Sequence, residues 1–132
     1  MVTDDIMNLT LWITTGLLTV AALTGGISKT FVSKDKLAHV PGGGWTNDHP
    51  AGFVKTLGVL ELLAVAGLTL PAVVDVVPVL VPITAACWIL LMVGATITHL
   101  RRGERAFVAL NLVYLALAAF IVWGRFGPHS FS

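Results

Sequence analysis

The residue best suited to chemistry is Glu61, a carboxylic acid inside an otherwise apolar run of residues. It follows the start of that run by about nine residues, so a helix rising about 1.5 Å per residue would carry it roughly 13 Å into a membrane. An ionisable group at such a depth costs roughly 2.5–3.5 kcal/mol and usually faces a cavity or a partner. In apolar surroundings the neutral acid is favoured, and it can donate a proton. Glu61 is therefore a candidate acid or base, or a polar clamp between helices.

Four further polar residues lie at a similar depth or on the same side. The amide of Asn111, within about a turn of Glu61 in depth, could orient a ligand or simply join helices. His99 could relay protons to Glu61, or bond the carbonyls at its helix end. Lys29 could neutralise a bound anion, or snorkel to the interface. We predict Glu61 and His99 as catalytic candidates, and Asn111, Lys29 and Thr96 as ligand-binding candidates.

The remaining histidines and the cysteine do not suggest a metal site. His39 and His49 lie in an irregular segment, His99 is at a helix end and His129 is on the opposite side of the membrane, so no i,i+4 pair or HExxH pattern arises. Cys87 is the one cysteine, which excludes an internal disulfide and a multi-cysteine cluster. We expect no bound metal or haem.

The elements that must position these residues are membrane-spanning helices. The chain has 132 residues, of which 56% are hydrophobic and only 11% are charged, whereas soluble domains are about a quarter charged. Its net charge of +1 and the lack of a basic stripe exclude a nucleic-acid partner. Crossing about 30 Å of hydrocarbon takes about 20 apolar residues. The runs that meet this length are residues 6–27, 52–70, 82–99 and 106–124. We predict an all-α integral membrane four-helix bundle that forms a single domain over residues 1–132.

Prolines set two of the predicted boundaries. The second helix is expected to end before Pro71, whose ring cannot continue it, and the third to begin near Pro82. Residues 28–51 form the one sizeable hydrophilic loop, which glycines 42–44 mark as irregular. We expect this loop to act as a lid or to lie at the membrane interface.

The basic residues predict the orientation of the chain. Seven of its eight cations lie on the side of the 28–51 loop, and only Arg125 lies on the other side. Because cytoplasmic loops carry an excess of Lys and Arg, this loop is predicted to be cytoplasmic and both termini non-cytoplasmic. The chain is thus expected to be a multi-pass protein of the cell membrane.

Several stretches resemble the DoxX-like family of small four-helix membrane proteins. They are GISK (residues 26–29), GVLELLAVAGLTLP (58–71), LLMVGATITHLRRGE (90–104) and WGRFGP (123–128). The resemblance implies a four-helix bundle and places Lys29, Glu61, His99 and Arg125 at positions that the family's pattern carries. It also implies an association with quinone-linked thiosulfate oxidation and with membrane complexes that handle oxidants and thiols. This chain departs from dithiol chemistry, because it has no pair of thiols.

Two functions from different classes follow. The first is an accessory or anchoring subunit of a membrane oxidoreductase system, with a quinone or another apolar ligand held in a pocket near Glu61. The second is a small membrane enzyme that uses Glu61 in acid–base chemistry on a quinone- or isoprenoid-like substrate. The only cofactor expected is a bound quinone or lipid. The expected partners are membrane lipids, oxidoreductase subunits and further copies of the chain, since small residues on the second and third helices suit close packing.

Overall fold

Each of the four apolar runs forms one long helix in the computed structural model, which describes residues 2–130. These helices are α1 (Val2–Phe31), α3 (Ala51–Val73), α4 (Leu80–Arg101) and α5 (Arg105–Phe126). All four are long and apolar enough to cross a membrane, and residues 2–130 contain no strand. The predicted all-α, four-helix membrane architecture is confirmed.

The helices extend beyond the predicted boundaries. α1 begins before residue 6, where Asp4 and Asp5 in its first turn complement the positive end of the helix dipole. α3 continues through Pro71, which differs from the predicted end of this helix at residue 70. Pro71 has no N–H to donate within the helix, but the following turn still forms, because the Val74 N–H donates to the Leu70 carbonyl at 2.9 Å.

The loop predicted over residues 28–51 contains two short helices rather than only irregular chain. They are α2 (Lys34–Ala38) and the 3-10 helix η1 (Gly44–Asp48). Ser33 caps α2 by accepting a hydrogen bond from the Lys36 N–H at 3.4 Å. In η1 the Thr46 hydroxyl donates to the Gly43 carbonyl at 2.8 Å. Helices this short show no hydrophobic periodicity in the sequence, so periodicity does not predict them.

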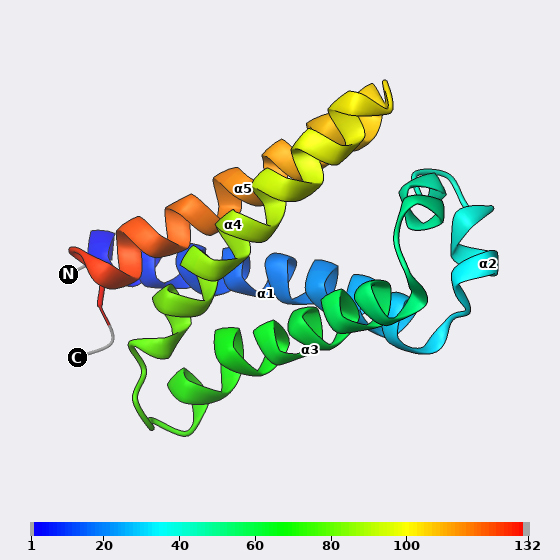
Figure 1. Ribbon diagram of the computed structural model, residues 1–132. Coiled ribbons are helices and arrows are strands. Elements are labelled where there is room, and N and C mark those ends of the chain that lie inside the picture. The colour runs from blue at the N-terminus through cyan, green and yellow to red at the C-terminus, as the bar shows by residue number, and fades with distance from the viewer. Residues whose placement is uncertain (1, 131–132) are drawn as a thin grey trace.

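The long helices pack as two pairs, with α1 along α3 and α4 along α5 (Figure 1). Glycines bring the first pair into close contact. A Cβ atom added to Gly58 would lie 2.5 Å from Thr30 Oγ1 and 2.7 Å from the Thr30 backbone nitrogen. A Cβ atom added to Gly26 would lie 2.8 Å from the Leu62 side chain. Small residues of this kind allow membrane helices to approach each other closely.

The hydrophobic core joins the two pairs in the half of the bundle that holds the chain termini. From there the pairs diverge towards α2 and η1 (Figure 1). The core draws on all four long helices and consists of Leu18, Ala22, Leu68, Val81, Ala85, Trp88, Met92, Ala118 and Ile121. One half of the molecule is therefore packed, and the other half is left open for a cavity.

Arg125 links the end of α5 to the beginning of α1. It is buried near the end of α5 and donates to Asn8 Oδ1 of α1 at 2.8 Å and to the His129 carbonyl at 2.9 Å. Its guanidinium also lies 5.9 Å from the ring centroid of Trp12. The two ends of the chain consequently lie at the same end of the bundle (Figure 1), as four crossings require.

Candidate functional site

A cavity of about 1030 Å³ separates the two helix pairs in the open half of the bundle. All four long helices line it, and Trp45 and His49 of the intervening loop close one end. Most of the lining is apolar, including Leu57 of α3 and Leu91 of α4. Of the five predicted site residues, four line this cavity: Lys29, Glu61, His99 and Asn111. The fold thus brings together polar groups that stand far apart in the sequence.

Lys29 and Glu61 form an ion pair in the α1–α3 wall. The Lys29 ammonium donates to Glu61 Oε1 at 3.0 Å and to Oε2 at 3.1 Å. The Glu61 side chain is only 6% exposed, whereas that of Lys29 is 22% exposed. Gly25 makes room for the pair, because a Cβ atom there would lie 2.7 Å from Glu61 Oε2. The carboxylate therefore has a cation as its partner, where sequence reasoning expected a neutral acid.

The opposite wall carries polar groups that have no partner. Asn111 of α5 is buried, and its Nδ2 meets no acceptor among residues 2–130. The same holds for Nε1 of Trp88, a buried residue of α4 that also lines the cavity. A buried donor without an acceptor costs about 1–3 kcal/mol. The hydroxyl of Tyr114, one turn after Asn111, likewise has no hydrogen bond within the described part of the chain.

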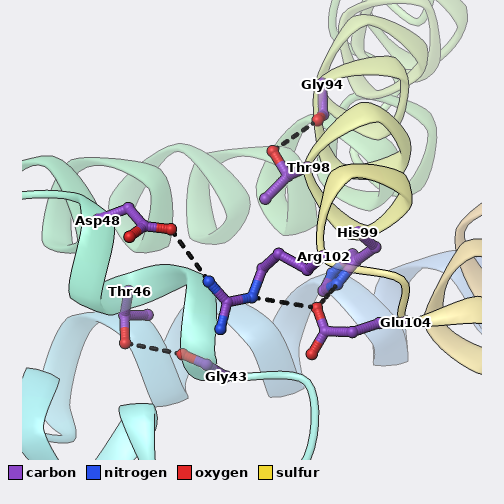
Figure 2. Close-up of polar contacts among 8 residues, drawn as sticks. All are labelled: Gly43, Thr46, Asp48, Gly94, Thr98, His99, Arg102 and Glu104. Carbon is purple, nitrogen blue, oxygen red and sulfur yellow. Dashed lines mark hydrogen bonds and ion pairs between the residues drawn. The ribbon is translucent and has the colours of Figure 1, made fainter.

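His99 connects the cavity wall to the loop through a chain of polar contacts (Figure 2). Its Nδ1 donates to Glu104 Oε1 at 2.8 Å, and its ring stacks on Phe107 at 5.4 Å between centroids. Arg102 lies 3.5 Å from the same Glu104 oxygen and donates to Asp48 Oδ2 of η1 at 3.0 Å. The α4–α5 turn is thereby fastened to the loop that covers the cavity.

Aromatic rings complete the covering of the cavity. His49 stacks on Phe53 of α3, with 4.6 Å between ring centroids, and meets Trp45 edge-on at 5.9 Å. All three residues line the cavity. Gly42, at a φ of 76°, lies so close to Phe107 of α5 that a Cβ atom there would be 2.5 Å from its ring. The loop thus contacts both helix pairs and lies across one end of the cavity, as a lid would.

Thr96 is the predicted site residue that does not line the cavity. Its hydroxyl donates to the Met92 carbonyl of its own helix at 2.7 Å, while Thr98, half a turn later, lines the cavity instead. Sequence reasoning also missed Tyr114 and the Glu104 partner of His99. A signal existed for each: Tyr114 lies three residues after Asn111, on the same helical face, and Glu104 ends the His-Leu-Arg-Arg-Gly-Glu turn.

Metal-binding residue types do not gather in the described part of the chain. Among residues 2–130, no group of three or more His, Cys, Asp or Glu side chains is placed to hold a metal ion. Cys87 is exposed and has no second thiol in the chain to pair with. The polar groups that line the cavity are thus an ion pair, an amide, a phenol, two indoles, two imidazoles and two threonine hydroxyls.

Four helices long and apolar enough to span a membrane, paired around a largely apolar cavity, define the class: a small polytopic membrane protein with an internal cavity. The model of the DoxX-like family matches residues 13–121, and the chain belongs to that family. This confirms the resemblance found in the sequence. Comparison with curated proteins and with solved structures gave no match.

Proposed function

We propose that this DoxX-like protein binds a lipid-soluble molecule in the cavity between its helix pairs and serves as an accessory or anchoring subunit of a membrane oxidoreductase system. The observation that carries the proposal is the cavity itself. Its volume of about 1030 Å³ lies just above the range of about 300–1,000 Å³ found for ligand sites. An apolar lining with a few polar groups is also typical of such sites.

The oxidoreductase association is supported by the family rather than by the cavity. The family resemblance implies quinone-linked oxidation and membrane complexes that handle oxidants and thiols. A quinone has a polar ring and an apolar tail, which suits a cavity whose polar groups stand among apolar side chains. A quinone is therefore the first ligand to test, and other lipids of similar shape follow.

Acid–base catalysis by Glu61 is the alternative function. Glu61 and Asn111 line the same cavity, as that mechanism requires. Both carboxylate oxygens of Glu61, however, accept hydrogen bonds from Lys29, and Nδ1 of His99 is bonded to Glu104. A general base must reach the substrate's proton at about 2.6–3.2 Å. Because Lys29 of the same cavity wall occupies both oxygens of Glu61, the geometry favours ligand binding over acid–base catalysis by Glu61.

A pair of alanine variants tests the binding proposal. Ala95 of α4 lines the cavity, and Ala119 of α5 is exposed on the outside of the bundle. We expect a lipid-soluble molecule to copurify with the wild type and with Ala119→Phe, and to be retained less by Ala95→Phe, whose ring would project into the cavity. Native mass spectrometry of protein extracted from its own membrane measures this. Equal retention of the molecule by the two variants would place it outside the cavity and overturn the proposal.

The subunit role needs a second measurement on the same extracts. We expect a stoichiometric protein partner to copurify with the wild type and with Ala95→Phe, because that substitution is internal. Oxidoreductase activity of the copurified partner identifies its class. A chain that extracts without any partner, while it turns over the bound molecule, would support the enzyme alternative instead.

A further inference from the structure

Resting on the proposed binding function, we infer that the ligand carries an uncharged, hydrogen-bond-accepting head group, which the α5 wall holds through Asn111 and Tyr114. The head group is thus an ester, ketone or similar carbonyl compound rather than a carboxylate or an amine. Glu61 then lines the cavity, paired with Lys29, and does not bind the ligand directly. Three observations on the two walls support this assignment.

The first observation is the set of unsatisfied donors on the α4–α5 side. Asn111 and Tyr114 are three residues apart, close to one helical turn, so both lie on one face of α5, and both line the cavity. The Asn111 amide nitrogen is buried and has no acceptor within residues 2–130, and Tyr114, which is half-buried, has no hydrogen bond from its hydroxyl there. Trp88 adds a second buried donor without an acceptor, on the neighbouring helix. An indole N–H can only donate, and a buried donor requires an acceptor.

The second observation is the charge balance of the opposite wall. Lys29 and Glu61 line the cavity as a closed ion pair, in which the ammonium contacts both carboxylate oxygens at 3.0 and 3.1 Å. Among the described lining residues, these two are the only Lys, Arg, Asp or Glu side chains. A charged head group would have to break this pair or stay unpaired in apolar surroundings, which is unfavourable. The cavity therefore selects an uncharged molecule.

The third observation is the aromatic character of the lining around these donors. Trp88, Tyr114 and Phe107 line the α4–α5 side, Trp45 lines the cavity from the loop, and Phe53 lines it from the start of α3. Rings of this kind present flat apolar faces beside polar edges. A planar carbonyl or ester group can lie against such a face while its oxygen accepts from Asn111 or Tyr114. An alkyl tail would then extend along the apolar residues of the four helices.

Three probes of equal chain length separate the head-group classes: methyl palmitate is an uncharged acceptor, palmitate is an anion and hexadecane has no head group. Each is titrated into delipidated protein in detergent, and binding is followed by native mass spectrometry. We expect methyl palmitate to bind about tenfold more tightly than either of the others. Asn111→Leu and Tyr114→Phe should each weaken methyl palmitate by about threefold to tenfold and leave hexadecane unchanged. Thr69→Val removes a hydroxyl outside the cavity and is the control.

The outcomes separate this inference from the binding function beneath it. If hexadecane and methyl palmitate bind equally, and Asn111→Leu changes neither, the cavity holds apolar chains but the head-group assignment is wrong. If palmitate binds most tightly and Lys29→Met abolishes that preference, the site selects anions and the assignment is also wrong. If no probe binds the wild type, both the assignment and the binding function fail. A circular dichroism spectrum of each variant checks that the helices remain.

Discussion

The pairing of Lys29 with Glu61 explains how this chain tolerates an acid deep in an apolar helix. A carboxylate within the membrane is costly alone, but a bidentate contact with an ammonium compensates much of that cost. Gly25 supports the contact, because any larger residue would collide with the Glu61 head. Lys29 is therefore the partner of an internal charge as well as one of the seven cations on the side of the loop.

Removal of one member of the pair should destabilise the fold more than removal of both. Glu61→Gln leaves the Lys29 ammonium without its anion, and Lys29→Met leaves the carboxylate bare. We expect each single variant to lose about 1–3 kcal/mol of unfolding free energy, because it leaves an unpaired group in a desolvated site. The double variant should regain most of that loss. Unfolding of the purified protein in mixed micelles measures all four proteins; strictly additive losses would show that the pair is not coupled.

The sequence made part of this site predictable. Glu61 stands out because an ionisable residue in an apolar run demands an explanation, and Asn111 because an amide at similar depth is its natural counterpart. The pairing with Lys29 was not predictable, since it depends on the rotation of α1 against α3. Tyr114 is marked in the sequence only by its spacing of three residues from Asn111, and its place beside the cavity distinguishes it from a packing residue.

Among the elements, the long helices were predictable and the short ones were not. Four apolar runs of the required length fix the membrane spans, whatever the tertiary contacts are. Their ends shift by a few residues because the helices continue through Pro71 and beyond the predicted starts. The helix α2 depends on local capping by Ser33, and η1 contains a hydrogen bond from the Thr46 hydroxyl to the Gly43 carbonyl. Gly42, between these two helices, contacts Phe107 of α5, and composition reveals none of these contacts.

The close contact between α1 and α3 depends on Gly58. A methyl group at this position would meet both the side chain and the backbone nitrogen of Thr30, so the two helices would have to separate. We expect Gly58→Ala to lower the free energy of unfolding by about 1–3 kcal/mol through this overpacking. Gly94→Ala is the matched control, because a Cβ atom there meets nothing within 4 Å. Thermal unfolding in detergent compares them; equal midpoints would contradict the contact.

The loop across the cavity should respond to the loss of its ion pair with α4. Asp48→Asn breaks the ion pair with Arg102. The Asp48 side chain is 64% exposed and that of Arg102 is 35% exposed, so the pair contributes only about 0.2–1 kcal/mol to stability. We expect amide exchange in η1 to accelerate by about twofold to fivefold, which hydrogen–deuterium exchange mass spectrometry measures. Asp35→Asn is the control, as that carboxylate has no ion-pair partner in the described chain. If both variants exchange alike, the aromatic contacts alone hold the loop.

At the scale of the whole molecule, the bundle is divided into a packed half and an open half. The core and the Arg125 contacts fix the half that carries the termini, and the cavity occupies the half covered by the loop (Figure 1). The packed half fixes the positions of the four helices relative to one another, while the two helix pairs are separated in the half covered by the loop. A ligand in the cavity would bridge the pairs where direct helix contacts are replaced by space.

The distribution of charge predicts the orientation of this divided molecule in its membrane. The loop end carries seven of the eight cations, so the positive-inside rule predicts that the loop and the covered end of the cavity face the cytoplasm. Single cysteines test this in a Cys87→Ser background, which removes the one native thiol. We expect Asn47→Cys, in η1, to react with a membrane-impermeant maleimide only after the cells are opened. Thr3→Cys, near the start of α1, should react in intact cells. The reverse labelling pattern would contradict this orientation and place the loop on the non-cytoplasmic side. A ligand that enters past the loop would then come from that side.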